Sequence, residues 1–266
     1  ERVYAPNGRF DFRISSQGKK LAERIPEDAH PDVIQAWLDN SELRWLERTS
    51  LKMVDPQLLC AFTERWHPET SSFHMSFGEM TITLDDVACL LHLPVRGDFF
   101  TPVSYTMEQA AALAVELFGV DYYAALAETQ HQRGGYFSQQ WIYDCYRGCL
   151  ASGRYAEAAR AYMYLIVGCT IFADKSYTRI DAKWLPIFRH LDQLHRFSWA
   201  SAALVCLYDN LNDASKFETK SLAEYATLLQ VNKRRHQRRI YALRMAMEFD
   251  MGEGSAVNVL LLSWIK

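Results

Sequence analysis

The stretch of sequence that decides the fold is residues 155–172, which read YAEAARAYMYLIVGCTIF. The second half of this stretch is apolar on nearly all sides, so a helix built from it has no polar face to turn toward water. Such a helix is stable only when other elements surround it. We therefore predict a central buried helix here. The longest nearly apolar run, Ala161 to Ala173, is too short to span a bilayer.

Helix start and stop signals recur on both sides of this segment. Asp55-Pro56 supplies an N-cap and a first helical residue, Thr106 and Gln109 have capping-box spacing, and Gly119 is a natural C-terminal stop. Ser198 is placed to cap a helix that carries Trp199. The chain is therefore predicted to be mainly α, a single globular multi-helix domain. The other helices are expected near residues 31–43, 56–66, 83–93, 121–131, 138–150, 221–230 and 237–249.

One stretch alone carries a β pattern. Phe73, Met75 and Phe77 alternate with polar residues, Gly78-Glu79 indicates a turn, and apolar residues alternate again from Met80 to Leu84. This pattern predicts a small β-hairpin near residues 72–84 with one buried face.

The domain boundaries follow from composition. Residues 1–30 are polar and irregular, which is typical of an N-terminal arm or loop, and residues 31–266 are expected to form the domain. The joins at Gln230-Val231 and Ser255-Ala256 are abrupt, which suggests that a loop is missing from the sequence near 230 or near 255.

Composition and charge leave the function class open. The 266 residues are 49% hydrophobic and 23% charged, with a net charge of −3, so nothing in the overall charge calls for a nucleic acid or a membrane. No Cys-x-x-Cys pair occurs, so the cysteines are expected to be reduced core thiols of an intracellular protein. They are Cys60, Cys89, Cys145, Cys149, Cys169 and Cys206.

Familiar catalytic motifs are missing from the sequence, which contains no G-x-S-x-G, Walker A or H-E-x-x-H pattern. Three weaker constellations of reactive residues are present. The carboxylates of Glu69, Glu79, Asp85 and Asp86 could share metal ions for phosphoryl transfer, but turns and helix starts attract acidic residues in any case.

The other two are a zinc site and a Schiff base. The set His67, His74, Cys60 and Cys89 lacks the close pairing of structural zinc ligands. Lys175 could form a Schiff base, but nothing near it resembles a phosphate-binding cup, and a helix end explains a lysine equally well. No metal and no cofactor are therefore expected.

The strongest local charge feature is a basic run near the C-terminal end. Its members are Lys233, Arg234, Arg235, Arg238 and Arg239. Such a run is typical of a nuclear localisation signal or of a phosphate-binding patch, but a solvated helix start has the same composition. Both interpretations stay open.

Residues 62–97 resemble the signature of a known family. They contain the Phe-Thr-Glu-Arg-Trp-His-Pro-Glu-Thr stretch, the Gly-Glu-Met-Thr-Ile-Thr-Leu-Asp-Asp-Val-Ala stretch and Leu-His-Leu-Pro-Val. This closely resembles the plant mobile domain, also called the aminotransferase-like plant mobile domain. Residues 160–176 and 198–208 resemble its central helix and next core helix. The residues that match the family motif, and to which we assign structural roles, are Trp66, Pro68, Glu69, Phe73, Gly78, Glu79, Thr83, Asp85, Asp86, Pro94 and Trp199.

The resemblance, strongest to the domesticated members that maintain meristems, implies a function. It implies a nuclear, non-enzymatic protein–protein interaction domain, acting with a partner related to plant protein phosphatase type 7. The family is linked to transposable-element silencing, genome stability and meristem maintenance. The exposed side of the hairpin and residues 97–137 are the candidate partner surfaces. Two alternatives stay open: a direct nucleic-acid-binding domain that uses the basic run, and a transposon-derived metal-dependent nuclease.

Overall fold

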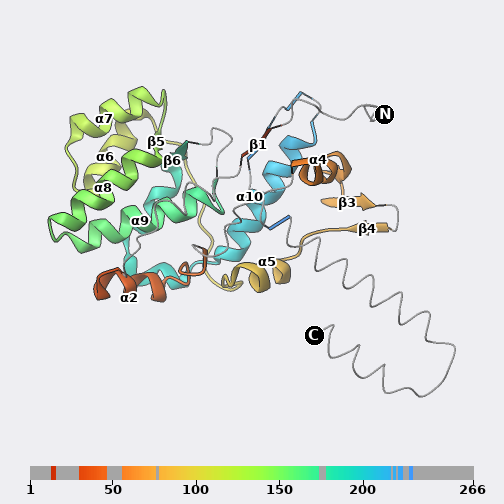
Figure 1. Cartoon of the computed structure of the whole chain (residues 1–266), viewed down its shortest axis with the longest axis horizontal. Helices are drawn as coiled ribbons and strands as arrows, with labels where there is room; N and C mark the ends of the chain where they lie inside the picture. The colour runs from red at the N-terminus through yellow and green to blue at the C-terminus, as the bar shows by residue number, and fades with distance from the viewer. Residues whose placement is uncertain are drawn as a thin grey trace, which may run out of the picture.

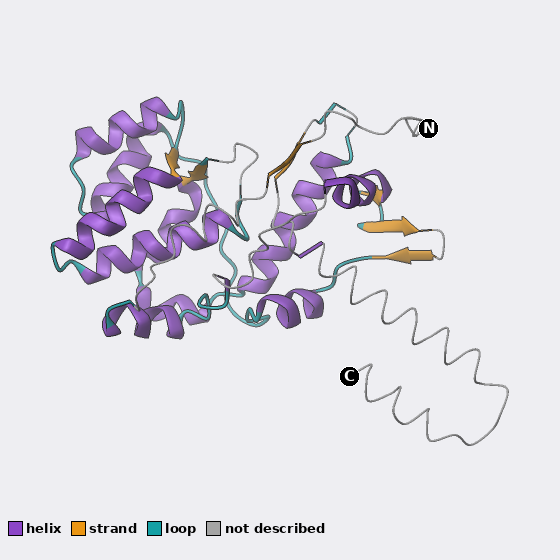
Figure 2. Cartoon of the chain, viewed as in Figure 1, coloured by secondary structure: helices purple, strands orange, loops and turns teal. Residues whose placement is uncertain are grey.

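A computed structural model describes residues 13–15, 30–46, 56–75, 78–173, 178–216, 218–219, 221–223 and 228–229. The described chain is mainly α with small sheets, which confirms the predicted fold class. Helices α6 (Met107–Phe118) to α9 (Tyr155–Cys169) form one group, and α10 (Trp199–Ala214) lies beside it. Helices α5 (Leu84–Leu91) and α4 (Pro56–Arg65) and the strands β3 (Ser72–Met75) and β4 (Gly78–Met80) lie on the side of α10 away from this group (Figures 1 and 2).

The bounds of the elements are as follows. The α-helices are α2 (Asp32–Asn40), α4 (Pro56–Arg65), α5 (Leu84–Leu91), α6 (Met107–Phe118), α7 (Tyr122–His131), α8 (Gln139–Ala151), α9 (Tyr155–Cys169) and α10 (Trp199–Ala214). Two 3-10 helices are η1 (Ala182–Arg189) and η2 (Leu191–Arg196). The strands are β1 (Arg13–Ser15), β2 (Trp66–His67), β3 (Ser72–Met75), β4 (Gly78–Met80), β5 (Tyr136–Ser138), β6 (Arg179–Asp181) and β7 (Ser221–Ala223).

Helix α9 is the predicted central buried helix. Every residue from Ala161 to Cys169 is buried, and α8, α6, α2 and η1 pack around it. A Cβ atom on Gly168 would lie 2.4 Å from the Ile180 side chain, so glycine permits β6 to approach the helix closely. The Tyr164 hydroxyl donates to the carbonyl oxygen of Asp181 at 2.9 Å, which satisfies a fully buried polar group. The central helix was therefore correctly predicted, although it ends at Cys169 rather than at Phe172.

The predicted caps of α6 are present. The Thr106 side chain accepts from the Gln109 amide at 3.3 Å, and the Gln109 side chain accepts from the Thr106 amide at 3.0 Å. Gly119 ends the helix with a φ of 62°, the left-handed conformation that glycine adopts without strain. Local capping chemistry alone fixes both ends of this helix.

The hairpin prediction is confirmed in outline and corrected in detail. Strands β2, β3 and β4 form an antiparallel three-stranded sheet, in which Phe73 pairs with Met80 and Met75 with Gly78. The prediction of a turn at Gly78-Glu79 was wrong, because these residues begin β4. Trp66, expected in the preceding helix, lies in β2. The strand pattern also stops at Met80, because the cap of α5 takes over at Thr83.

The predicted helix over residues 221–230 is wrong at its start. Residues Ser221–Ala223 form β7 and pair in parallel with β1, which lies within the predicted N-terminal arm. Pairing over such a sequence separation leaves no local signal, and the same holds for the antiparallel pair β5–β6. The basic run, Lys175, the expected helix over residues 237–249 and the joins at 230 and 255 lie outside the described residues.

Candidate functional site

The motif residues of the sheet hold it to helix α10. The indole Nε1 of Trp66 donates to Asn212 Oδ1 at 2.8 Å, and the Trp66 and Phe73 rings meet edge to face with centroids 4.8 Å apart. The Tyr208 hydroxyl donates to the carbonyl oxygen of Ile82 at 2.8 Å. Trp66 and Phe73 are buried, whereas Pro68 and Glu69 lie in the turn that follows β2. Trp66 and Phe73 therefore take part in packing the sheet against α10.

The acidic candidates do not form a metal centre. Asp86 is buried and closes a capping box, in which its carboxylate accepts from the Thr83 amide at 2.9 Å and the Thr83 hydroxyl at 2.8 Å. Glu79 accepts from the Ser72 hydroxyl at 2.9 Å and lies 3.2 Å from His74 Nε2, while Asp85 is exposed. Nowhere in the described residues do three or more His, Cys, Asp or Glu side chains gather as metal ligands.

The zinc candidates are also apart. The rings of His67 and His74 stack on the polar face of the sheet, with centroids 3.6 Å apart. Cys60 lies in α4, where its thiol donates to Glu64 at 3.7 Å, and Cys89 is exposed on α5. The histidine pair therefore lacks the thiolates that the zinc hypothesis required.

The last two motif residues, Pro94 and Trp199, mark a junction between distant parts of the chain. The Ala200 amide donates to the carbonyl oxygen of Pro94 at 3.0 Å. The indole Nε1 of the buried Trp199 donates to the carbonyl oxygen of Leu194 at 3.0 Å. Ser198 is the N-cap residue of α10, as predicted, but its side chain makes no capping bond, because its hydroxyl donates to the carbonyl oxygen of Val95 at 2.6 Å instead.

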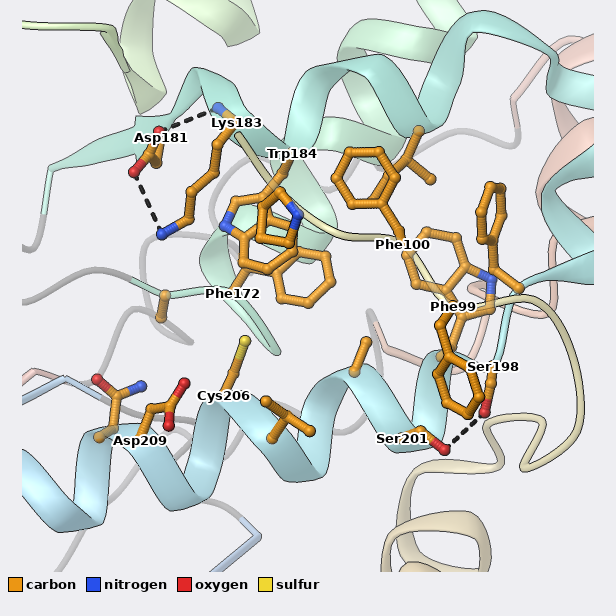
Figure 3. A pocket seen from close by; sticks show the side chains of 18 of the residues that line it. Phe99, Phe100, Phe172, Asp181, Lys183, Trp184, Ser198, Ser201, Cys206 and Asp209 are labelled. Atoms are coloured by element: carbon orange, nitrogen blue, oxygen red, sulfur yellow. Dashed lines mark hydrogen bonds and ion pairs between the residues drawn. The ribbon is translucent and has the colours of Figure 1, made fainter. Parts of the chain in front are cut away.

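This junction sets the position of a cleft of about 530 Å³. One wall is the face of α10 that carries Val205, Cys206 and Asp209; the opposite wall is the region of Phe172 and Trp184 (Figure 3). The loop after Gly97 brings Phe99 and Phe100 to one end. The aromatic side chains that line the cleft are Phe99, Phe100, Tyr136, Phe172, Trp184, Phe197 and Trp199.

Stacked aromatic rings form the wall opposite α10. Phe172 and Trp184 lie nearly parallel, at 9° and with centroids 3.9 Å apart, and both are buried. The Lys183 ammonium lies 5.2 Å from the centre of the Trp184 ring and 3.4 Å from Asp181 Oδ2. This lysine therefore combines a cation–π contact with an ion pair, and its charge is already matched.

The thiol in the cleft is held protonated. Burial raises the pKa of Cys206, Lys183 lowers it and Asp209 raises it by a smaller amount, and the net pKa is about 12. A thiol with such a pKa is a poor nucleophile at neutral pH. The cleft thus offers no reactive thiol. Its surface is mainly apolar with a few polar groups, an arrangement suited to the binding of a ligand or partner.

Sequence reasoning did not find this cleft. Its walls come from the segment just after α9, from β5, β6, η1 and α10, and from the loop at 98–102, which local patterns do not bring together. One signal was present: two adjacent phenylalanines, Phe99 and Phe100, follow a glycine in a predicted loop. Residues 98–102 also fall within the 97–137 segment that was a candidate partner surface.

The fold and cleft define a mainly α domain built around one buried helix. The sequence profile of the family described as plant mobile domain matches residues 42–264. The chain belongs to this family. None of the helices in the described part of the chain is long and apolar enough to span a membrane.

Similarity to curated proteins from Arabidopsis thaliana supports the same family. Protein MAIN-LIKE 1 is 32% identical over 234 residues, which are 83% of this chain and 45% of that protein. Protein MAINTENANCE OF MERISTEMS is 29% identical over 198 residues, 73% of this chain and 40% of that protein. The serine/threonine-protein phosphatase 7 long form homolog is 32% identical over 181 residues, 67% of this chain and 13% of that protein. The chain thus spans less than half the length of these relatives, and no solved structure matches it.

Proposed function

We propose that the chain is a non-enzymatic protein–protein interaction domain that acts in the plant nucleus together with a phosphatase-like partner. Its work there is transposable-element silencing, genome stability and meristem maintenance. The observation that carries the proposal is the aromatic cleft, whose rim includes Phe99 with 81% of its surface exposed. A large aromatic side chain exposed at the mouth of an apolar cleft is typical of a surface that a partner covers.

Two further observations favour a phosphatase-like partner and a role in meristems. A segment similar to this chain occurs within a phosphatase 7 homologue. Modules that are joined in one chain in one protein are good candidates to associate as separate chains in another. A second relative is named for the maintenance of meristems.

The test is co-expression with a plant type 7-like phosphatase homologue, followed by affinity capture and size exclusion with light scattering. We expect a stable complex. The variant Phe99→Ser should weaken capture about 30-fold or more, because truncation of a buried aromatic anchor commonly costs at least about 2 kcal/mol.

A matched control is available in Tyr123, which is 77% exposed but does not line the cleft. The variant Tyr123→Ser removes a similar exposed aromatic surface and should leave capture unchanged. If the folded chain captures no phosphatase homologue, the proposed partner is wrong, and the nucleic-acid alternative takes its place.

A further inference from the structure

The rim of the cleft exposes apolar side chains at two places. Phe99 is 81% exposed on the loop, and Val205 is 59% exposed on α10; both line the cleft. Val103, a few residues after Phe99, is 61% exposed. Single exposed apolar residues are common, but the two that line this apolar cleft, Phe99 and Val205, indicate a docking surface.

The size of the cleft limits what can occupy it. A volume of about 530 Å³ lies within the range of pockets that bury a drug-sized ligand, about 300–1,000 Å³. Such a volume holds a few side chains rather than a folded element. A short peptide segment that inserts two or three neighbouring side chains fits this size.

The charges around the cleft favour a cationic occupant. Three carboxylates of the described residues line it: those of Asp98, Asp181 and Asp209. Asp181 is paired with Lys183 at 3.4 Å, and Asp98 lies 3.5 Å from Arg196. Within the described part of the chain, Asp209 makes no ion pair, and it is exposed at the end of the cleft near Cys206 (Figure 3).

An acidic occupant is disfavoured for the same reason. Among the described residues that line the cleft, the one lysine is Lys183, which is held by Asp181 and by the face of Trp184, so its charge is already compensated. An acidic side chain would meet the unmatched carboxylate of Asp209, and like charges that meet at an interface weaken binding.

We propose that the cleft binds a short segment of a protein partner in which a lysine or arginine lies beside a bulky apolar side chain. The cationic group pairs with Asp209, and the apolar side chain packs between Phe99 and Val205. This inference rests on the proposed interaction function and specifies the chemistry of the segment that the partner inserts. An arginine suits the site especially well, because its guanidinium plane can also stack on aromatic rings.

The experiment is selection of a random peptide library, displayed on phage, against the full chain. Selected peptides are then synthesised and their dissociation constants are measured by fluorescence anisotropy. We expect enrichment of peptides with Lys or Arg next to Phe, Leu or Met. Asp209→Asn should weaken their binding about three- to fivefold, as for an exposed ion pair, and added salt should reduce this difference. Val205→Asp should abolish binding.

Matched variants separate the cleft from general charge. Asp192→Asn removes one carboxylate from η2, is exposed and does not line the cleft, so it should leave peptide binding unchanged. Circular dichroism confirms that each variant is folded. Selected peptides without a basic residue, or binding that Asp209→Asn does not weaken, would overturn the inference.

The two proposals fail in different ways. If the phosphatase homologue is captured through Phe99 but no peptide is selected, the interaction function stands and the peptide inference is overturned. If basic peptides bind as expected but the phosphatase homologue is not captured, the peptide inference is supported and the phosphatase partnership is wrong.

Discussion

The Ser198 hydroxyl donates a 2.6 Å hydrogen bond to the carbonyl oxygen of Val95, 103 residues earlier in the chain. Next to it, the Asp98 amide donates to the carbonyl oxygen of Arg196 at 2.6 Å, and the Ser198 amide donates to the carbonyl oxygen of Asp98 at 3.1 Å. These bonds tie the start of α10 to the loop that carries Phe99. The position of the aromatic rim therefore depends on this junction.

Gly97 is the residue that permits the junction. Its φ is +144°, and a Cβ atom there would lie 2.2 Å from the carbonyl oxygen of Arg196. Because that contact is with backbone, Gly97→Ala must displace one of the two segments. We expect a loss of about 2–3 kcal/mol in the free energy of unfolding, measured by urea titration. The displaced loop should also weaken partner capture.

Gly148 supplies the matched control for this change. It lies exposed within α8, and a Cβ atom there would meet nothing within 4 Å. Gly148→Ala should therefore stabilise the chain by about 0.5–1 kcal/mol through helix propensity. Equal stability of the two variants would show that the backbone contact at Gly97 carries no strain.

Substitution of Asp86 should destabilise the chain much more than substitution of its neighbour Asp85. The Asp86 carboxylate is buried in the capping box with Thr83, whereas Asp85 is exposed. Asp86→Ala should destabilise the chain by about 1–2 kcal/mol, because it removes the carboxylate half of the capping box of α5. Asp85→Ala should change stability by about 0.5 kcal/mol or less. Thermal denaturation measures both.

The same variants test the nuclease alternative. Magnesium should leave the melting temperature of the unaltered chain unchanged, because the described carboxylates form no metal cluster. A stabilisation by magnesium that disappears in both Asp85→Ala and Asp86→Ala, together with cleavage of DNA, would support the nuclease instead.

Local chemistry explains which parts of the fold the sequence predicts. The capping box at Thr106, the stop at Gly119 and the apolar run of α9 each lie within one segment, so each has a readable signal. The pairing of β1 with β7 joins residues more than two hundred positions apart and leaves no such signal. Gly78 indicated a turn nearby, but glycine tolerates positive φ at the first position of a strand as well.

The cleft could not be predicted for the same physical reason. Asp209, Trp184 and Phe99 come from three segments whose meeting depends on tertiary packing. The sequence does not show that Pro94 and Trp199 lie where the loop before Gly97 meets the start of α10; only the fold brings these segments together.

The ion pair between Glu116 and Arg189 predicts a small dependence of stability on pH. Arg189 donates from Nε to Glu116 Oε1 at 2.7 Å and from Nη2 to Oε2 at 3.0 Å. These hydrogen bonds lower the pKa of Glu116 below 4.5. The pair therefore contributes stability above pH 4.5, and this contribution is lost as the pH falls through the lowered pKa.

The measurement compares Glu116→Gln with the unaltered chain. Both side chains are more than 40% exposed, so solvent screening limits the effect at neutral pH to about 0.5 kcal/mol, or a degree or two in melting temperature. The two denaturation curves should converge once the pH falls below the lowered pKa of Glu116. A difference that persists unchanged into acid would show that the carboxylate is not what stabilises the folded state.

The role of the basic run can be tested by the nuclear localisation of the protein. The change is alanine at all five positions, Lys233, Arg234, Arg235, Arg238 and Arg239. If the run is a localisation signal or a phosphate-binding patch, a fluorescent fusion should leave the nucleus or lose its retention on DNA. In vitro, DNA binding should also weaken steeply with salt. Unchanged localisation and unchanged DNA retention would leave the run as a solvated surface.

Cys206 offers a direct probe of the cleft. Its pKa of about 12 leaves a thiolate fraction of about one in ten thousand at pH 8, so maleimide should modify it far more slowly than the exposed Cys89. Cys145 has a similar pKa of about 12 but does not line the cleft. Mass spectrometry of the labelled chain therefore allows the two slow thiols to be compared. A partner seated in the cleft should slow modification of Cys206 at least threefold and leave Cys145 unchanged. Equal protection of both thiols would mean that the partner stabilises the whole domain instead of covering the cleft.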